Sequence, residues 1–332
     1  MGVGGGAVLE AADPALAAAV QDDLEVVEER LREVVRSAHP MLDEAGRHLV
    51  HAGGKRVRPL LALLAARLGE PAAPGVIDAA VVVELTHLAT LYHDDVMDEA
   101  EVRRGAASAN ARWTNTVAIL TGDFLFARAS DLTAGLGTEA THIQARTFAR
   151  LVEGQISETA GPAAGQDPVE HHLQVVADKT GSLLGTSARL GALMAGAPPA
   201  DVETVARFGE VFGAAFQLSD DLIDVLSETG QSGKTPGTDL REGIRTLPVL
   251  LVLADRDGDS ARLRELLEGD LADDGRLDEA LGLLRAHPAM DLARERLAAC
   301  VEQARAVAAD LPSGPVRQAL DALTDFVLAR TG

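Results

Sequence analysis

Apolar and polar residues alternate with a helical period along almost the whole chain. Apolar side chains recur three and four positions apart, the spacing that places them on one face of an α-helix. No stretch shows the two-residue alternation of a half-buried strand, and no Asn-Gly pair marks a hairpin turn. The pattern therefore predicts an all-α protein of about ten to thirteen helices with short connections.

Prolines indicate where several of these helices begin. Asp13-Pro14, Asp167-Pro168 and Pro198-Pro199 each place a proline in a first helical turn, where its missing N–H is tolerated. The Gly-rich residues 1–12 are expected to be disordered, and residues 227–248, rich in glycine, are expected to form a mobile loop. No linker divides the remainder, so we predict one domain over residues 13–332.

Composition supports helices and limits the partners. Ala and Leu dominate while aromatic residues make up only 3% of the chain, which favours helix over strand. A net charge of −21 argues against nucleic acid as a partner. No uncharged apolar run is long enough to predict a transmembrane segment, and the N-terminus lacks a signal-peptide pattern. The single cysteine, Cys300, excludes a disulfide within the chain and is typical of a cytoplasmic protein.

Two stretches carry the pattern Asp-Asp-x-x-Asp at the ends of long apolar segments. Residues four apart share a helix face, so each motif crowds carboxylates together, and a hard cation such as Mg²⁺ relieves their repulsion. A single motif of this kind is ordinarily a solvated helix end, but two of them beside apolar segments favour a metal–diphosphate site. The first motif lies at 91–98 and the second at 217–224, and their carboxylates belong to Asp94, Asp95, Asp98, Asp220, Asp221 and Asp224.

Basic residues concentrate near these motifs although the chain is strongly acidic. Arginine offers a planar fork of donors to phosphate oxygens, and lysine offers a point charge. An isolated basic loop is often only solvated surface, and a lone histidine on an apolar helix, such as His87, is usually a packed core residue. Beside two acidic motifs, we interpret the basic residues as direct ligands of an anionic group: Lys55, Arg56, Arg58, Arg103, Arg104, Lys179 and Lys234.

Taken in order, these motifs resemble those of the trans-polyprenyl diphosphate synthases, the isoprenyl diphosphate synthases of long-chain type. The resemblance spans about residues 50–250 and rests on "GGKRVRP", "HLATLYHDDVMD", "RRG", "GDFLFARA", "GQ", "KTG", "FGAAFQLSDDLID", "GKTPGTDL" and "EGIRTLP". It implies an isoprenoid-synthase-like helical bundle around a central cavity. It also implies a prenyltransferase that uses Mg²⁺ to condense isopentenyl diphosphate with an allylic diphosphate, which is geranyl, farnesyl or geranylgeranyl diphosphate.

The resemblance assigns roles residue by residue. The six aspartates are implied to bind Mg²⁺, about three ions per active site. Contacts with the allylic diphosphate are implied for Arg103, Lys179, Lys234 and Gln155. The isopentenyl diphosphate site, which uses no metal, is implied for Lys55, Arg58, His87 and Arg104. The catalytic residues are implied to be Lys179, Thr180 and Gln217.

One position departs from the family pattern. Where the family often has lysine in "EGKxTLP", this chain has Ile244, with Arg245 next to it. Either Arg245 supplies the charge from a shifted position or the site does without it.

Residues just before the first motif set an expectation for product length. Ala89 and Thr90 are small at positions where short-chain members often carry bulky aromatics. This favours an open tunnel and a product from hexaprenyl to nonaprenyl length, with a geranylgeranyl diphosphate synthase as the alternative. Phe124 and Phe126 are candidates for the floor of that tunnel, although plain core packing explains them equally well.

Three further interpretations compete less well. A class I terpene cyclase usually replaces the second aspartate motif and lacks "GGKRVRP". A non-catalytic subunit of a two-chain synthase is expected to lose the aspartates, which this chain keeps. A metal-free binding protein for acidic partners is the weakest alternative. The family usually forms homodimers, and the Ala- and Leu-rich helices allow one here.

Overall fold

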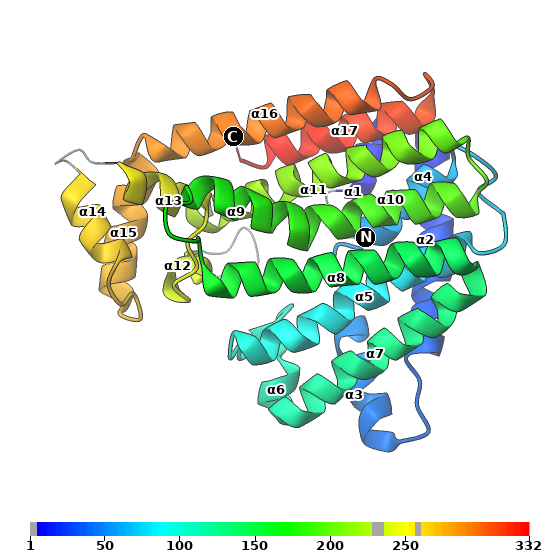
Figure 1. The fold of residues 1–332 in the computed structure, drawn as a ribbon, viewed down its shortest axis with the longest axis horizontal. Coiled ribbons are helices and arrows are strands. Elements are labelled where there is room, and N and C mark those ends of the chain that lie inside the picture. Colours follow the sequence, from blue (N-terminus) through cyan, green and yellow to red (C-terminus); the bar gives the residue numbers. More distant parts are fainter. Residues whose placement is uncertain (1–4, 228–235, 256–259, 332) are drawn as a thin grey trace.

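Helices make up nearly all of the computed structural model, which describes residues 5–227, 236–255 and 260–331 (Figure 1). The predicted all-α class is confirmed. The first half of the chain forms α1 (Gly5–Ala12), α2 (Pro14–Val34), α3 (Pro40–His51), α4 (Val57–Ala66), α5 (Val76–Met97), α6 (Ala109–Arg112), α7 (Asn115–Leu136) and α8 (Thr138–Ala160). The second half forms α9 (Pro168–Val176), α10 (Ser182–Met194), α11 (Pro199–Leu226), α12 (Thr238–Arg241), α13 (Leu247–Ala254), α14 (Ala261–Leu267), α15 (Asp274–Ala286), α16 (Ala289–Ala308) and α17 (Pro315–Ala329).

The helix starts predicted from proline are confirmed. Helices α2, α9 and α11 begin at Pro14, Pro168 and Pro199. The Asp13 carboxylate accepts two backbone N–H bonds at the start of α2, each 3.0 Å long, and Asp167 does the same for α9. These side chains satisfy N–H groups that a helix leaves unpaired at its first turn.

The first residues differ from the prediction of disorder. Residues 5–12 form α1, which packs against α2 and α17, and Leu9 is buried. Residues 1–4 lie outside the described part of the chain. Burial of one apolar face against two longer helices outweighs the cost of placing glycine in a helix, which is about 1 kcal/mol per residue.

Helix α5 lies at the centre of the bundle. It packs against α7, α4, α10 and α2, and most of its side chains are buried around its whole circumference. Among the described helices, only α5 is long and apolar enough to cross a membrane, but 67% of that window is buried in the protein. A helix that is apolar all round is what the core of a large bundle requires.

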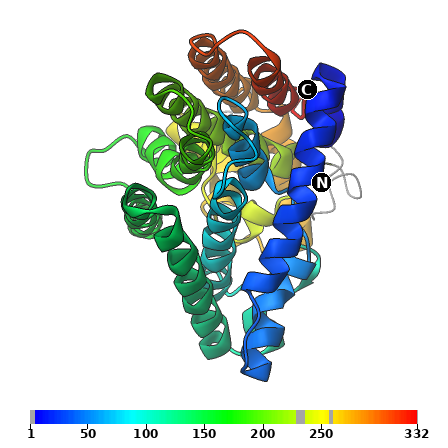
Figure 2. The same cartoon turned by 90° about the vertical axis from the view of Figure 1, so that its right-hand side faces the viewer.

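The long helices lie in layers along one direction. In Figure 1, α16 and α17 lie above α10 and α11, and α8 runs below α10, which also packs directly against α5. Turned by 90°, α7 and α8 form one flank and the N-terminal helix α2 the other (Figure 2). Helices α5 and α7 pack closely, as do α10 and α11, and the two aspartate motifs lie at the ends of α5 and α11.

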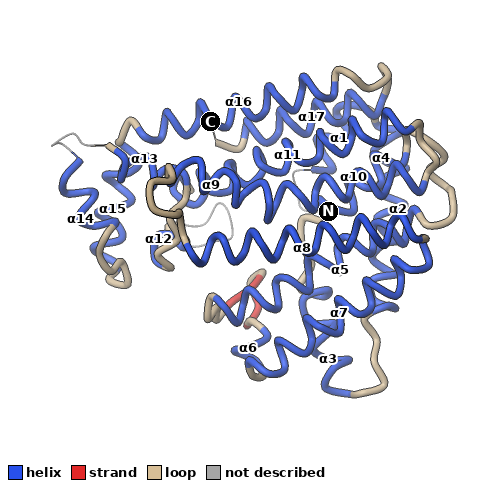
Figure 3. Tube along the Cα trace, in the orientation of Figure 1, coloured by secondary structure: helices blue, strands red, loops and turns tan. Residues whose placement is uncertain are grey.

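Two short irregular elements carry predicted site residues. Strands β1 (Val102–Arg103) and β2 (Ala106–Ala107) form a small antiparallel hairpin at the end of α5, coloured red in Figure 3, where only helices were predicted. Arg104 and Gly105 both have positive φ, 54° and 76°, as the two central residues of a type I′ turn require. The second element is a π-helical turn, η1 (Ala177–Gly181), between α9 and α10.

Candidate active site

The first aspartate motif ends α5. Asp94 and Asp95 lie in its last turn, and Asp98 is the C-cap residue, whose backbone N–H donates to the Asp94 carbonyl at 2.8 Å. Burial raises the pKa of Asp94 to about 6, with Asp98 and Glu158 adding to the rise and Lys179 opposing it. A protein charges a buried carboxylate only when a cation compensates it.

Arg103 compensates the second aspartate of this motif. From β1 its Nε donates to Asp95 Oδ1 at 2.6 Å, and its guanidinium lies 3.9 Å from the Asp98 carboxylate. Asp95 is fully buried, and its Oδ2 has no hydrogen-bond partner among the described residues. The hairpin therefore folds an arginine back onto the motif and leaves one buried carboxylate oxygen for another cation.

The second motif ends α11 and has different neighbours. Asp220 forms ion pairs with Lys55, at 3.4 Å, and with Arg330 from the end of α17. Asp221 lies 3.3 Å from His172 Nε2 and accepts a bond of 3.0 Å from the Gln217 amide. The Asp224 carboxylate accepts a hydrogen bond of 3.2 Å from the backbone N–H of Asp239.

The π-turn η1 faces both motifs. Lys179 lies close enough to the first motif to lower the pKa of Asp94 and Asp98, and it pairs with Glu158 on α8. Thr180 donates to Gln217 at 3.1 Å, and Gln217 in turn holds Asp221 of the second motif. The wider π-turn thus directs two successive side chains to different motifs, a role that such turns often have at functional sites.

Arg150 on α8 fixes the back of η1. Its Nε donates to Asp178 at 2.5 Å, and its Nη1 donates to Glu210 on α11 at 2.7 Å. A side chain at Gly154 would lie 3.0 to 3.1 Å from atoms of Asp178 and Lys179, so α8 approaches η1 closely there. The two bonds of Arg150 and the close approach at Gly154 hold α8, η1 and α11 together behind the site.

Three of the four residues predicted to bind isopentenyl diphosphate gather between α4, α5 and the hairpin. Burial lowers the pKa of His87 far below its usual value, and the charges of Arg58 and Arg104 add to the effect. Burial also lowers the pKa of Arg58 to about 10, and the Arg58 Nε has no partner among the described residues. The cluster therefore holds arginine cations and a neutral imidazole beneath the surface, where an anion is attracted strongly.

Lys55 completes this group from the loop before α4. It reaches Asp220 and lies 5.1 Å from the centre of the Phe216 ring. The predicted isopentenyl diphosphate residues and the second motif therefore adjoin one another through Lys55 and Asp220.

Not every predicted residue is placed in the site. Lys234 lies outside the described residues. Gln155 lies on α8 next to Gly154, and its side chain forms no hydrogen bond with the described residues. Ile244 and Arg245 are both exposed, and Arg245 forms no ion pair within the described segments, so Arg245 is not seen to replace the family lysine.

The aspartates do not form a complete metal cage by themselves. Within residues 5–227, 236–255 and 260–331, no group of three or more His, Cys, Asp or Glu side chains is arranged to hold a metal ion. Arg103, Lys55, Arg330 and His172 lie against the carboxylates instead. A hard cation such as Mg²⁺ keeps several waters and shares phosphate oxygens, so it needs only one or two carboxylates from each motif.

Several site residues were not singled out in the sequence. Glu158, His172 and Arg330 each contact a predicted site residue from α8, α9 or α17. Glu158 lies one turn after Gln155 on α8, a spacing that offers a signal. His172 and Arg330 are distant in sequence from the motifs, and no local pattern marks them.

Of the two small residues before the first motif, Ala89 lies inside the bundle, whereas Thr90 is only partly buried and its hydroxyl donates to the His87 carbonyl at 2.8 Å. Ala89 is fully buried, and its carbonyl oxygen would lie 3.1 Å from a side chain placed at Gly122 on α7. One turn further along α7, Phe126 packs against Phe148 of α8 with ring centres 4.2 Å apart. Phe124 faces away, toward Gly46 and Arg128. Of the two phenylalanines, only Phe126 therefore faces the α5–α8 side.

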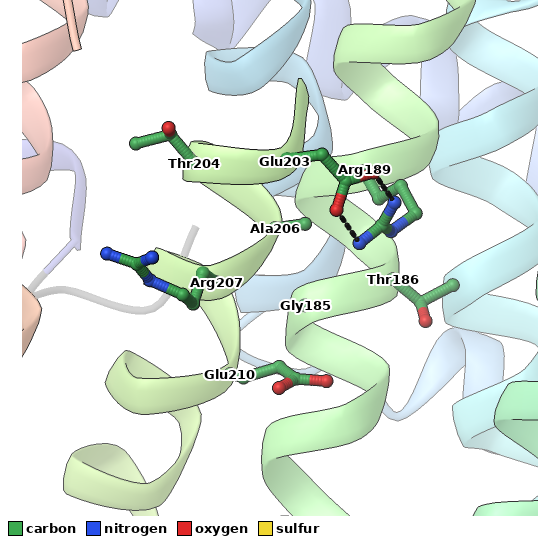
Figure 4. Close-up of a pocket in the computed structure, with 8 residues that line it drawn as sticks. All are labelled: Gly185, Thr186, Arg189, Glu203, Thr204, Ala206, Arg207 and Glu210. Carbon is green, nitrogen blue, oxygen red and sulfur yellow. Dashed lines mark hydrogen bonds and ion pairs between the residues drawn. The ribbon is translucent and has the colours of Figure 1, made fainter. Parts of the chain in front are cut away.

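A pocket of about 270 Å³ lies elsewhere, between α10 and α11 (Figure 4). Arg189 and Glu203 face one another across it and form an ion pair. None of the predicted site residues lines it, although Glu210, the partner of Arg150, does.

Comparison with known proteins matches the chain to one family. The family model described as "Polyprenyl synthetase" matches residues 39–284. The chain is 51% identical to nonaprenyl diphosphate synthase of Mycobacterium tuberculosis over 96% of each protein. Geranylgeranyl pyrophosphate synthase of Corynebacterium glutamicum, solved with calcium and isoprenyl diphosphate, superposes with a TM-score of 0.86 at 46% identity, covering 96% of this chain and 98% of that one. Polyprenyl synthase of Caulobacter crescentus, solved with the same ligands, gives a TM-score of 0.87 at 32% identity, covering 96% and 97%.

Proposed function

This chain belongs to the polyprenyl synthetase family and is a trans-polyprenyl diphosphate synthase, and from that premise we propose its metal, its product class and its assembly. The metal is Mg²⁺, about three ions per site. The substrates are isopentenyl diphosphate and an allylic diphosphate, and the product is a long chain between hexaprenyl and nonaprenyl diphosphate. The 51% identity to a nonaprenyl diphosphate synthase is the observation that best supports this length.

The carboxylates of the two motifs fit a hard divalent cation. Asp95 has a buried oxygen without a partner in the described chain, and burial raises the pKa of Asp94, so both gain from a nearby positive charge. When bound, Mg²⁺ neutralises diphosphate charge and makes that group a better leaving group. Asp94, Asp95 and Asp98 would hold it from the end of α5, and Asp220, Asp221 and Asp224 from the end of α11.

The cations of the chain divide between two diphosphates. Arg103 and Lys179 lie against the first motif and bind the oxygens of the allylic diphosphate there. Lys55, Arg58 and Arg104 bind isopentenyl diphosphate, and neutral His87 donates a hydrogen bond to it. Thr180 and Gln217 are hydrogen-bonded to one another beside Asp221 of the second motif, and we assign them to orienting the reacting carbons.

Product length depends on the space beyond Ala89. Its small side chain lets the growing chain pass along α5, and the Phe126–Phe148 pair closes the path further down. A second candidate product is geranylgeranyl diphosphate, because the Corynebacterium synthase with that name is structurally similar.

We also propose a homodimer in the cytoplasm. Exposed apolar side chains cluster on the flank formed by α7 and α8, which Figure 2 shows at the edge of the molecule. They are Ile119, Leu120, Val152 and Ile156. A second copy that covers this flank would bury them.

The test of the proposal is a product assay. The purified chain is incubated with Mg²⁺, labelled isopentenyl diphosphate and farnesyl diphosphate, and the dephosphorylated products are sized by chromatography. Products from hexaprenyl to nonaprenyl would support the long-chain proposal, whereas a stop at geranylgeranyl would leave the reaction intact and refute the open path past Ala89. No incorporation would overturn the proposed activity of the isolated chain.

Two matched variants locate the floor of the path. Phe126→Ala should lengthen the product, because it removes one ring of the pair that closes the path. Phe124→Ala removes the same side chain from the same helix but on the face toward Gly46, so it should leave the product length unchanged. Equal effects of both variants would show that Phe126 has no special part in setting length.

A further inference from the structure

A buried carboxylate lies beneath the arginines of the isopentenyl diphosphate site. Glu84 is on α5, one turn before His87, and only 1% of it is exposed. Arginines from two separate segments surround it: Arg56 and Arg58 from the start of α4, and Arg104 from the hairpin. A charged side chain is almost never buried this deeply unless it is paired.

Direct contacts tie Glu84 to both segments. Arg56 Nη1 donates to the Glu84 carboxylate at 2.7 Å, and Arg104 Nη2 lies 3.9 Å from the same oxygen. Arg56 is itself buried, and its other face pairs with Glu28 on α2. Glu84 thus joins α5 to the loop before α4 and to the hairpin.

The backbone at both arginines is strained. Arg56 and Arg104 have φ angles of 49° and 54°, in the left-handed region that disfavours residues with a side chain. Such conformations persist where surrounding contacts hold them in place. Arg56 also donates to the Val50 carbonyl at 3.1 Å, and Arg104 donates to the Leu49 carbonyl at 3.3 Å, so both side chains are fixed at several points.

Arg104 also lies against the glycine pair before Lys55. It donates to the Gly53 carbonyl, and a side chain at Gly54 would lie 2.9 Å from its guanidinium carbon. The loop that carries Lys55 therefore packs against Arg104, and Arg104 in turn lies beside Glu84.

We propose that Glu84 is the positioning residue of the isopentenyl diphosphate site: through Arg56 and Arg104 it fixes the loop and the hairpin so that Lys55, Arg58 and Arg104 face the diphosphate. This inference rests on the proposed function of that site. The buried Arg58 Nε has no hydrogen-bond partner among the described residues, whereas the Arg56 guanidinium is bonded to Glu28, Glu84 and the Val50 carbonyl.

The test compares two isosteric variants on the same helix. Glu84→Gln removes the central charge. Asp78→Asn removes a carboxylate of α5 six residues earlier, which pairs with Arg30 on α2 at 3.0 Å rather than with an arginine of the isopentenyl diphosphate site. We expect Glu84→Gln to raise KM for isopentenyl diphosphate by about 10- to 100-fold, as supporting residues around a site typically do, with KM for farnesyl diphosphate changed less than about threefold. Asp78→Asn should change neither value.

Binding measured without metal separates positioning from a loss of stability. Titration calorimetry with isopentenyl diphosphate in EDTA should show the same loss of affinity in Glu84→Gln, at a temperature where circular dichroism shows the variant folded. Unchanged affinity, or an equal rise of both KM values, would overturn the positioning role. Failure of the wild-type protein to bind isopentenyl diphosphate would instead overturn the proposed function.

A milder variant decides the matter if Glu84→Gln does not fold. Glu28→Gln removes the outer partner of Arg56 while the partly exposed position tolerates the amide. A rise of a few-fold in KM for isopentenyl diphosphate alone supports the proposal, and no change refutes it.

Discussion

The two aspartate motifs share one sequence pattern but differ in how the protein compensates their charge. In the first, Arg103 holds Asp95, while Asp94 is buried with its pKa raised to about 6 and Lys179 as its main opposing charge. In the second, Asp220 has two cationic partners, Lys55 and Arg330. The carboxylates of the first motif thus have fewer cationic partners than they need to offset their charge, whereas Asp220 of the second motif is paired with two cations.

Both motifs lie at helix C-termini, where the helix dipole disfavours negative charge. Each must therefore obtain positive charge from elsewhere. The second motif obtains it from Lys55 in the loop before α4 and from Arg330 at the end of α17, whereas burial keeps the pKa values of Asp94 and Asp98 in the first motif raised. A repeated motif thus identifies two acidic positions without showing that they are equivalent.

Removing a single carboxylate, from either motif, should lower kcat more than any other substitution considered below. We expect Asp94→Asn and Asp220→Asn each to lower kcat by about 10³-fold, because each removes a carboxylate that we propose as a ligand of the Mg²⁺ on the leaving group. Steady-state rates of incorporation measure this, with Asp78→Asn as the control on α5. A loss below about tenfold in either variant would remove that motif from the reaction.

The next largest effects should distinguish the two functional side chains of η1, Lys179 and Thr180, by their losses of kcat. Lys179→Gln removes the cation facing the first motif and should lower kcat by about 10²-fold, whereas Thr180→Val breaks only the bond to Gln217 and should cost about tenfold. Thr159→Val, whose hydroxyl bonds within α8, is the control. Equal losses at both positions would contradict the division of η1 between the motifs.

In the absence of metal, removing a carboxylate from the first motif and from the second should change the free energy of unfolding in opposite directions. At pH 8 in EDTA, Asp94→Asn should raise the free energy of unfolding by about 3 kcal/mol, because it removes a buried charge whose pKa is raised in the folded state. Asp220→Asn should lower that free energy by about 1–2 kcal/mol, because the largely buried Arg330 loses its carboxylate partner.

The pH dependence checks the sign of the Asp94 effect. The raised pKa means that wild-type protein loses stability as pH rises from the ordinary value of 3.8 through about 6. The advantage of Asp94→Asn should therefore disappear near pH 4, as urea denaturation at the two pH values measures. An advantage that persists at pH 4 would show that it does not arise from ionisation.

The smallest expected effect concerns the histidine of the second motif. His172→Gln should raise the Mg²⁺ concentration for half-maximal activity by up to about tenfold, because His172 orients Asp221 from a distance of 3.3 Å. The adjacent His171 faces Ser157 instead, so His171→Gln should leave the Mg²⁺ dependence unchanged. An identical response of both variants would argue against a role for His172 at the metal.

Sequence alone predicts those features that a short stretch encodes. The proline starts, the all-α class and the position of both motifs at helix ends follow from local chemistry. The structure adds what depends on distant contacts: His172 beside Asp221, Arg330 beside Asp220 and Glu84 beneath the arginines. The hairpin was missed because strands of two residues show no alternation, although Arg104-Gly105 fits its turn.

Helices α9 and α10 are joined without a break by the π-helical turn η1. A change at η1 that makes this helix more regular would also move the side chains that η1 presents. One residue fewer between Ala177 and Gly181 would let regular α-helical hydrogen bonds run without interruption. It would also rotate one side of the helix by about 100° relative to the other, so that Lys179 and Thr180 no longer reach their separate motifs. Shortening η1 would therefore gain regular helical hydrogen bonds and lose both of these contacts.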